Sequence, residues 1–451
     1  MKVVQQHSVS YDMTQVGINF ATRNHYHRLV VKGKENLPTE GSYIIAPCHQ
    51  NALMEPLVVL ASIRKPVVFL ARADIFNKPL LAKFFHWSRI MPVYRIRDGK
   101  ESLSKNVDIF EKSKNVLLDH VPLCLMAEGR HNNKHQLLPL VKGMFRIAGE
   151  TQKALGDEPL YIVPTGIDYD EYERPFANVV INYGKPIPVK PFMTQYEENE
   201  PIALNQMRQA LDESLRPLMH DIRSLEYYEE INGLCNACNR TVRKEEGLRN
   251  TVWNRFDVRR RISVRLDKMV ADGCEKAAPI VHLGKEYNRV CQELKFRPQL
   301  PSERWNLGLL CLSTIAFASI ILAACWFPKV LCGLLFCLIC FPLPFLPTHL
   351  IPRKLIKDPQ FRSSVNYGIR LVFGMLYALA FSIIFACCHG WYWFFISMIA
   401  AMILSFISGD VICWLRGMLD NWRYRFAQLL HRDKVAYLDT IIKEVSSSMK
   451  A

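Results

Sequence analysis

The sequence predicts an α/β protein whose mostly parallel sheet is flanked by helices, followed by a helical segment and an α-helical membrane domain of about four spans. Two observations support this fold class. Short apolar runs alternate with amphipathic helical stretches over residues 25–220, a pattern typical of parallel α/β sheets. Four long apolar runs follow over residues 305–408, and about 20 apolar residues suffice to cross a bilayer.

The α/β domain is predicted element by element. An entry helix comes first, assigned to residues 1–24, although its apolar pattern extends over 11–31. The domain itself is assigned to residues 25–220. Its predicted strands are "GSYIIAPCH", "KPVVFLAR", "MPVYR", "VPLCLMAEGR", "PLYIVPTGID" and "FANVVINYGKPIPV". Its predicted helices cover residues 51–63, 78–90, 99–120 and 143–155, where apolar residues recur every three or four positions.

Strand signals stop after this domain, and residues 221–304 are predicted to form a basic helical segment. Its arginine cluster allows two interpretations, a helix face against lipid headgroups or a solvated face. The cluster comprises Arg259, Arg260, Arg261 and Arg265. Cys235 and Cys238 form one CxxC pair without a second pair at zinc-site spacing, so we expect small apolar helix residues rather than metal ligands.

The membrane domain is assigned to residues 305–408. Its apolar runs cover residues 305–327, 330–347, 368–388 and 391–408, and short connections pair them into two helical hairpins. Basic residues gather before the first run, between the second and third, and after the fourth. Because positive residues stay on the cytosolic side, we expect an integral membrane protein. Its catalytic domain and its C-terminal helical tail, residues 409–451, would both face the cytosol.

The net charge of +15 restricts the partners. A basic chain binds nucleic acid, an anionic membrane surface or an anionic substrate. No zinc-finger, RNA-binding or basic-zipper pattern is present, so nucleic acid is not expected, and membrane lipids are the favoured partner. The 14 cysteines, several of them inside apolar runs, indicate reduced core residues rather than a disulfide framework.

The stretch "APCHQNALMEP" places His49 directly after a predicted buried strand. Ligands bind at the carboxyl ends of the strands in open α/β sheets. A histidine there has the chemistry to take a proton from a hydroxyl, and Glu55 is the nearest downstream carboxylate that would orient its ring. A spacing of six does not put both side chains on one helical stripe, so the pair must straddle a bend. An ordinary turn without chemistry is the alternative.

Two further strand ends carry polar groups. Arg95 follows "MPVY", while Glu128 and Gly129 end another strand, with Arg130 directly after them. Arginine binds phosphate groups, and glycine lets the backbone approach a ligand closely. A polar surface loop is the alternative for the second group. The stretch "IVPTGI" is expected to be structural rather than chemical.

Together these blocks resemble those of the glycerolipid acyltransferase superfamily, which includes 1-acylglycerol-3-phosphate and glycerol-3-phosphate acyltransferases. The order is His-x5-Glu, "PVYR", "AEG" and "VPTGI", preceded by "KGKENLP", within residues 25–215. The family's own blocks are NH-x4-D, PV-x-R, FPEG and VPV. This chain has Cys48 in place of the Asn, Glu55 in place of an Asp one position earlier, and Ala127 in place of the Pro.

The resemblance implies roles for the matching residues. His49 would be the catalytic general base on an acceptor hydroxyl, and Glu55 the acid that orients it. The implied substrate-binding residues, at the glycerol-phosphate end of the acceptor, are Arg95, Glu128, Gly129 and Arg130. The acyl donor would be a thioester, acyl-CoA or acyl-carrier protein. No cofactor or metal is expected.

The predicted function is that of a membrane O-acyltransferase, which moves a fatty acyl group from an acyl thioester to the hydroxyl of 1-acylglycerol 3-phosphate (lysophosphatidate) in phospholipid synthesis. A glycerol-3-phosphate acyltransferase or another lysophospholipid acyltransferase is the alternative, because these acceptors need the same base and phosphate clamp. A non-catalytic lipid-binding membrane protein is a third hypothesis, motivated by the departures at Cys48, Met54 and Ala127.

Overall fold

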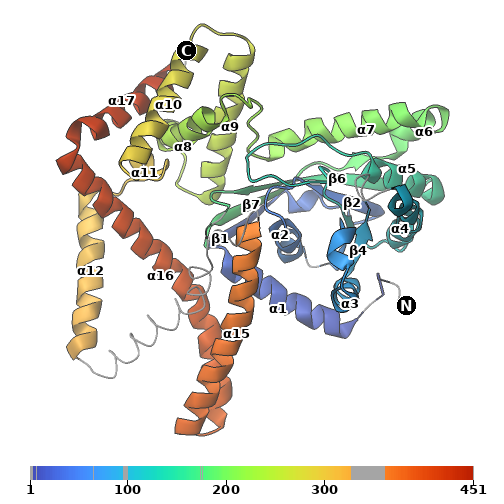
Figure 1. Ribbon diagram of the computed structural model, residues 1–451, viewed down its shortest axis with the longest axis horizontal. Helices are drawn as coiled ribbons and strands as arrows, with labels where there is room; N and C mark the ends of the chain where they lie inside the picture. The colour runs from blue at the N-terminus through green and yellow to red at the C-terminus, as the bar shows by residue number, and fades with distance from the viewer. Residues whose placement is uncertain are drawn as a thin grey trace. The chain divides into compact units, whose positions relative to one another are not determined.

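The computed structural model describes residues 4–6, 8–63, 65–94, 100–172, 174, 176–326 and 361–449. The chain forms two compact units (Figure 1). The first contains Met1–Arg23, Leu29–Tyr172 and Asn178–Asp221, and the second contains Asn24–Arg28, Glu173–Ala177 and Ile222–Ala451. The first unit holds the sheet, and the second is built from helices.

The first unit is organised around a mixed sheet. Its strands follow the order β1-β7-β6-β2-β5-β3-β4, with β8 paired to β6. The strands are β1 (Arg28–Lys32), β2 (Ser42–Pro47), β3 (Val68–Arg72), β4 (Ile90–Val93), β5 (Leu123–Cys124), β6 (Leu160–Tyr169), β7 (Asn178–Tyr183) and β8 (Ile187–Pro188). The strands from β6 to β4 pair in parallel, whereas β7 and β8 run antiparallel to β6. The predicted mostly parallel sheet is therefore a mixed sheet with a parallel centre.

Helices connect the parallel strands and cover the sheet. They are α1 (Val9–His25), α2 (Met54–Ser62), α3 (Pro79–Trp87), α4 (Lys100–Leu118), α5 (Gly143–Leu155), α6 (Met193–Glu198) and α7 (Glu200–Leu215). α5 and α7 both pack against β6, and α4 packs against β2, β4 and β5. The predicted entry helix over 11–31 needs a correction, because α1 ends at His25 and the next residues form β1. Val30 and Val31 are β-branched and suit a strand better than a helix end.

The centre of the sheet positions the candidate site. All residues of β2 are buried, and Ile44 pairs in register with Leu123 of β5 and with Ile162 of β6. A continuous apolar run of this kind is typical of a strand that is covered on both faces. Since β2, β3, β4 and β5 are parallel, their carboxyl ends lie along one edge of the sheet, where ligands bind in open α/β folds.

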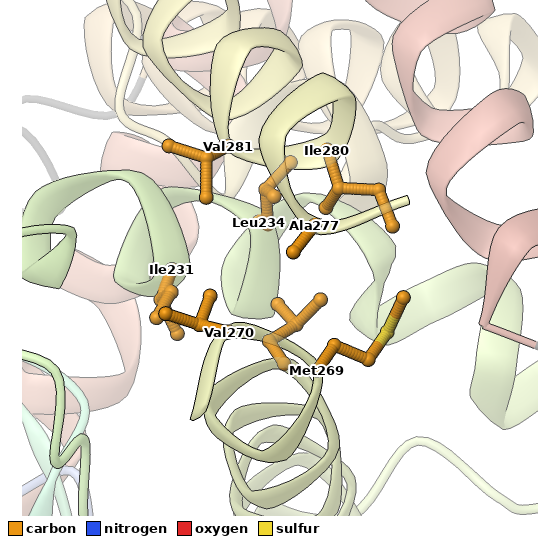
Figure 2. Close-up of a pocket in the computed structure, with 8 residues that line it drawn as sticks. Ile231, Leu234, Met269, Val270, Ala277, Ile280 and Val281 are labelled. Carbon is orange, nitrogen blue, oxygen red and sulfur yellow. The ribbon is translucent and has the colours of Figure 1, made fainter. Parts of the chain in front are cut away.

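The second unit has an apolar core among α8, α9, α10 and α17. Its helices are α8 (Tyr228–Glu245), α9 (Val252–Ala271), α10 (Ala277–Glu293), α11 (Leu300–Glu303), α12 (Leu307–Trp326), α15 (Arg362–His389), α16 (Tyr392–Leu430) and α17 (Arg432–Ser448). Cys235 and Cys238 lie inside this core, and burial raises the pKa of both thiols, which disfavours the thiolate form that binds metal. Figure 2 shows a small pocket in the same core. The side chains that line it are all apolar, so it offers no catalytic group.

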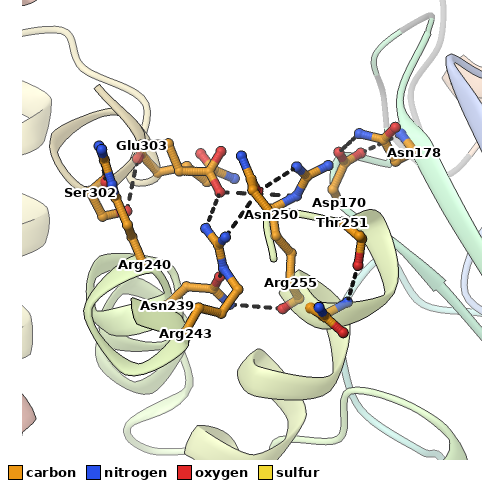
Figure 3. A network of polar contacts seen from close by, with 12 residues as sticks. Asp170, Asn178, Asn239, Arg240, Arg243, Asn250, Thr251, Arg255, Ser302 and Glu303 are labelled. Atoms are coloured by element: carbon orange, nitrogen blue, oxygen red, sulfur yellow. Dashed lines mark hydrogen bonds and ion pairs between the residues drawn. The ribbon is translucent and has the colours of Figure 1, made fainter. Parts of the chain in front are cut away.

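A buried arginine joins the helices of the second unit. Arg243 donates Nε to Asn239 Oδ1 at 2.7 Å and Nη1 to Asn250 Oδ1 at 3.0 Å, and it pairs with Glu303 at 3.4 Å (Figure 3). These bonds hold α8, the turn before α9 and α11 together. The predicted arginine cluster of α9 does not form one face, because Arg259 is buried among the helices.

The membrane prediction is tested only in part. Among the described residues, α15 is the one helix long and apolar enough to cross a membrane, and Leu307–Leu322 forms a shorter apolar stretch within α12. The predicted run 330–347 lies outside the described residues. The predicted run 391–408 lies within α16, which continues through the predicted boundary at residue 408 without a break. One such helix is a weak indication of membrane association.

Candidate active site

The candidate site begins where β2 passes into α2. β2 ends two residues before His49, and α2 begins one residue before Glu55. Between them, Ala52 has a φ of 48°, in the left-handed region that non-glycine residues rarely adopt. This turn reverses the chain so that the first turn of α2 faces the histidine. The predicted bend between the two residues is confirmed.

His49 and Glu55 form a hydrogen-bonded pair. Glu55 Oε2 lies 3.2 Å from His49 Nδ1, while Glu55 Oε1 accepts the backbone N–H groups of Gln50 at 3.2 Å and of Asn51 at 2.5 Å. The glutamate side chain is 0% exposed, whereas the histidine is 15% exposed. An ionised carboxylate at Nδ1 makes that nitrogen the proton carrier. The lone pair of the neutral ring then lies on Nε2, as a general base requires.

The other side of the His49 ring is open to a substrate. Within the described ranges, Nε2 has no hydrogen-bond partner. The ring of His131 lies edge-on to it, with 5.1 Å between ring centroids. Sequence reasoning did not single out His131, although it directly follows the predicted "AEGR" block. Its position beside the base makes it a neighbour of any bound acceptor.

Glu128 ties together the loops at two strand ends. Its Oε1 accepts the N–H of His49 at 2.7 Å, and its Oε2 accepts the N–H of Leu138 at 2.9 Å. Burial raises the pKa of Glu128 to about 8, although the two N–H donors act in the opposite direction. Both carboxylate oxygens are engaged with the backbone, so in this structure Glu128 fixes the loop that carries the base. Its implied contact with the substrate stays a prediction.

Gly129 and Arg130 follow the carboxyl end of β5, which belongs to the same edge of the sheet. Gly129 has a φ of 62°, and a Cβ on it would lie 3.1 Å from Val141 Cγ1, so this turn requires glycine. Arg130 is exposed next to it. Arg95 lies outside the described residues, and the strand before it, β4, ends at Val93. The structure therefore brings the base, its acid and the "AEG" turn together and leaves Arg95 untested.

One departure from the family's blocks, at Cys48, has a structural explanation. Cys48, in place of the usual Asn, is buried, and its Sγ lies 3.1 Å from the N of Ile167 and 3.3 Å from its O. Its thiol thus bridges β2 to β6. In "VPTGI", a Cβ on Gly166 would lie 2.1 Å from the carbonyl oxygen of Leu218. This close approach agrees with the structural role expected of that stretch.

A second histidine–carboxylate pair is connected to the first. His135 Nδ1 lies 3.0 Å from Asp168 Oδ1 and 2.9 Å from the Tyr172 hydroxyl, which donates to Gln50 Oε1 at 2.8 Å. The ring of His220 packs on that of His135 at 4.5 Å between centroids. Sequence reasoning missed this cluster. The signal was available at Asp168, which lies near the end of a predicted strand at the edge of the sheet that carries His49.

Comparisons with known proteins agree with this site. Residues 28–168 match the family model described as Acyltransferase. These residues therefore form an acyltransferase domain, in agreement with the resemblance to glycerolipid acyltransferases, and the chain is an acyltransferase.

A solved structure also resembles the chain. It is the 1-acyl-sn-glycerophosphate (LPA) acyltransferase PlsC from Thermotoga maritima, with 18% sequence identity and a TM-score of 0.33. The similarity covers 45% of this chain and 80% of that chain. A likeness of that size is too small to assign a fold or a substrate. Among curated protein sequences, none matches the chain.

Proposed function

We propose that this acyltransferase moves a fatty acyl group from an acyl thioester to the hydroxyl of 1-acylglycerol 3-phosphate, a step of phospholipid synthesis. The observation that carries the proposal is the His49–Glu55 pair, which lies within the acyltransferase domain at the carboxyl edge of the sheet. The buried carboxylate fixes the ring, and the open Nε2 faces away from it. That arrangement suits the activation of a hydroxyl.

The proposed reaction is a direct transfer. His49 Nε2 takes the proton of the acceptor hydroxyl as its oxygen attacks the thioester carbonyl carbon. The tetrahedral intermediate collapses by breaking the carbon–sulfur bond, and the imidazolium returns its proton to the leaving thiolate. Glu55 stabilises the imidazolium between these events and keeps the ring in place. The products are the ester and a free thiol, so no metal, redox partner or covalent enzyme intermediate is required.

The acceptor's phosphate would be bound by cations and loops at the same edge. Arg95 and Arg130 supply the positive charge, and the turn at Glu128 and Gly129 shapes the site. Arginine suits this role because its planar fork binds phosphate oxygens in pairs. Arg95→Ala is expected to raise the KM for the phosphorylated acceptor about 10-fold and to change kcat little.

The proposal includes a membrane setting. A lysophospholipid acceptor resides in a bilayer, and the apolar helix α15 together with the apolar stretch of α12 supports a membrane anchor. We extend this to four spans, with the acyltransferase domain and the C-terminus in the cytosol. Protease or glycosylation mapping of an engineered tag within residues 349–367 tests the topology. A tag found outside the cytosol would show that the proposed arrangement is wrong.

An acyl-transfer assay on the purified full-length chain in mixed micelles tests the function. Labelled acyl-CoA is offered with lysophosphatidate, glycerol 3-phosphate or lysophosphatidylcholine. The expected result is transfer to lysophosphatidate, reduced about 10³-fold in His49→Ala. His282→Ala, an exposed histidine of α10, is the matched control and should keep full activity. Transfer to glycerol 3-phosphate alone would favour the alternative acceptor, and full activity of His49→Ala would exclude the mechanism.

A further inference from the structure

We propose that Tyr172 is a positioning residue for acyl transfer, which holds the loop between His49 and Glu55 and is itself held by the His135–Asp168 pair. The inference rests on the proposed function and deepens it. It assigns a task in catalysis to the buried cluster around His135. None of these side chains touches the reacting atoms.

Two residues of the loop connect Glu55 to Tyr172. The backbone N–H groups of Gln50 and Asn51 both donate to Glu55 Oε1. The side chains of the same two residues contact Tyr172. Its hydroxyl donates to Gln50 Oε1 at 2.8 Å, and its carbonyl oxygen accepts Asn51 Nδ2 at 3.3 Å. Tyr172 therefore restrains the two residues whose amides restrain the carboxylate.

The hydrogen-bond directions form one consistent series. The Oε1 of Gln50 only accepts, so the Tyr172 hydroxyl must donate its proton to it. The phenol oxygen then accepts from His135 Nδ1–H at 2.9 Å, and the same nitrogen lies 3.0 Å from Asp168 Oδ1. A proton on Nδ1 of His135 makes the hydrogen bond to Tyr172. The contact with Asp168 Oδ1 is a charge contact without hydrogen-bond geometry, unlike the hydrogen bond between His49 and Glu55.

Burial makes this series stiff. His135 is 8% exposed and Asp168 is 2% exposed, and the loop residues Gln50 and Asn51 are each 1% exposed. Water does not replace a bond lost at such positions, so removing one hydroxyl leaves both a donor and an acceptor without their partner. The loop would relax, and the carboxylate that it carries would shift. A displacement of about 1 Å at a catalytic group can cost up to about 10²-fold in rate.

The decisive experiment compares two tyrosine-to-phenylalanine variants of the full-length protein. Tyr172→Phe removes only the hydroxyl that contacts Gln50 and His135. Tyr183→Phe is the control, because the hydroxyl of Tyr183 also bonds to a side chain, Ser62 Oγ at 2.6 Å, in a different part of the sheet. Tyr183 is buried and Tyr172 only half-buried, so the control removes the more enclosed hydroxyl of the two. We expect Tyr172→Phe to lower kcat about 10-fold to 10²-fold with an unchanged KM for both substrates. Tyr183→Phe should keep wild-type kcat.

Variants of His135 separate positioning from packing. In His135→Asn, the side-chain amide can donate from near the position of Nδ1, whereas His135→Leu fills the space without a donor. We expect His135→Asn to recover at least several-fold of the kcat that His135→Leu loses. Equal losses in the two variants, or a loss in Tyr183→Phe equal to that in Tyr172→Phe, would overturn the proposal in favour of a structural role.

A readout independent of acyl transfer separates this proposal from the proposed function. The rate at which diethyl pyrocarbonate modifies His49, followed by mass spectrometry, reports how well the ring is held against Glu55. We expect this rate to rise several-fold in Tyr172→Phe and to stay unchanged in Tyr183→Phe, even if no tested acceptor is acylated. An unchanged rate in both variants would contradict the inference, whatever the substrate.

A separate measurement tests whether the cluster around His135 holds a metal ion. The ligand atoms of His135, Asp168 and His220 lie within 4.8 Å of one another, so they could also hold a metal ion. The metal content of the purified wild-type protein decides between the two. Stoichiometric zinc that is lost in His135→Asn would overturn the hydrogen-bond series, because the metal would then occupy Nδ1. We expect no stoichiometric metal and an activity that chelators leave unchanged.

Discussion

Two of the histidine–carboxylate pairs in the α/β unit have nearly the same dimensions and contrasting surroundings. His49 and Glu55 are 3.2 Å apart, and His135 and Asp168 are 3.0 Å apart. The first histidine is 15% exposed, and its Nε2 has no partner within the described residues. The second is enclosed by Tyr172 and by the ring of His220.

The contrast between the two pairs shows which features distinguish a catalytic base from a structural histidine. Glu55 makes a hydrogen bond with Nδ1 of His49, whereas Asp168 Oδ1 lies close to Nδ1 of His135 without hydrogen-bond geometry. Only the first pair leaves the opposite nitrogen available to a substrate, and only the first lies directly after the central strand of the sheet. A histidine–carboxylate distance alone therefore identifies neither role. The access of Nε2 and the place in the topology decide.

The largest expected effect is at Glu55, the carboxylate of the His49–Glu55 pair. Glu55→Gln should lower kcat about 10²-fold to 10³-fold with little change in KM, because an amide at this position cannot both accept the two backbone N–H groups and accept from Nδ1. Glu55→Asp keeps the charge but is one carbon shorter, so it should retain more activity than Glu55→Gln. Steady-state kinetics measure both. Wild-type turnover in Glu55→Gln would show that this pair is not catalytic.

The matching change in the buried pair should act mainly on stability. Asp168→Asn removes the buried carboxylate that lies 3.0 Å from His135 Nδ1, and the loss of such a buried charge contact should lower the free energy of unfolding by about 2 kcal/mol. We expect the apparent Tm of the purified protein to fall by a few degrees. The kcat of the folded fraction should fall about 10-fold, through Tyr172 and the loop. A kcat loss as large as that of Glu55→Gln would erase the distinction between the two pairs.

The parallel centre of the sheet and the His49–Glu55 pair could both be predicted from the sequence. The strand "YIIAP" is continuously apolar, so its burial and its place in the centre follow from composition. The pairing of His49 with Glu55 could be predicted from the sequence, because their spacing requires a bend between them. The positive φ of Ala52, which makes the bend, could not be predicted, because tertiary contacts impose a conformation that alanine disfavours.

The pairing of His135 with Asp168 was missed for a different reason, although the position of Asp168 near a strand end was predictable. Asp168 and His135 are 33 residues apart and belong to a strand and a loop with no shared pattern. Only the register of β6 beside β2 brings Asp168 close to the loop after His49. Long-range register depends on the whole sheet, whereas motif spacing is local. For the same reason, the antiparallel β7 and β8 were not distinguished from parallel strands.

A third buried carboxylate, Glu128, should make the stability of the protein depend on pH. Burial raises the pKa of Glu128 to about 8 from its usual 4.5, so the folded chain binds this proton more tightly than the unfolded chain. Between these two values the folded state holds more protons, and stability therefore falls as the pH rises. We expect the apparent Tm to decline from about pH 5 to pH 8, with a smaller slope in Glu128→Gln.

The slope, and not the level, is the quantity to compare for Glu128. The glutamine amide would face one of the two N–H donors, so Glu128→Gln should be less stable at every pH. Glu198→Gln, an exposed site on α6, is the control and should keep the wild-type slope. Equal slopes in all three proteins would mean that Glu128 is ionised throughout, held by its two donors.

The smallest expected effect is that of changing Arg130. This change tests how far the substrate site extends from the His49–Glu55 pair. Its side chain is exposed and directly follows the "AEG" turn, so Arg130→Ala should leave the apparent Tm unchanged. If it contacts the acceptor's phosphate, the KM for lysophosphatidate should rise about 3-fold to 10-fold while kcat stays constant, because a solvated cation contributes only a modest binding energy. Arg130→Lys keeps the charge and should recover part of the loss. Raising the ionic strength should reduce the difference in KM between wild type and Arg130→Ala, since salt screens exposed charges. An unchanged KM would show that Arg130 does not bind the phosphate, and Arg95 would be the next residue to test.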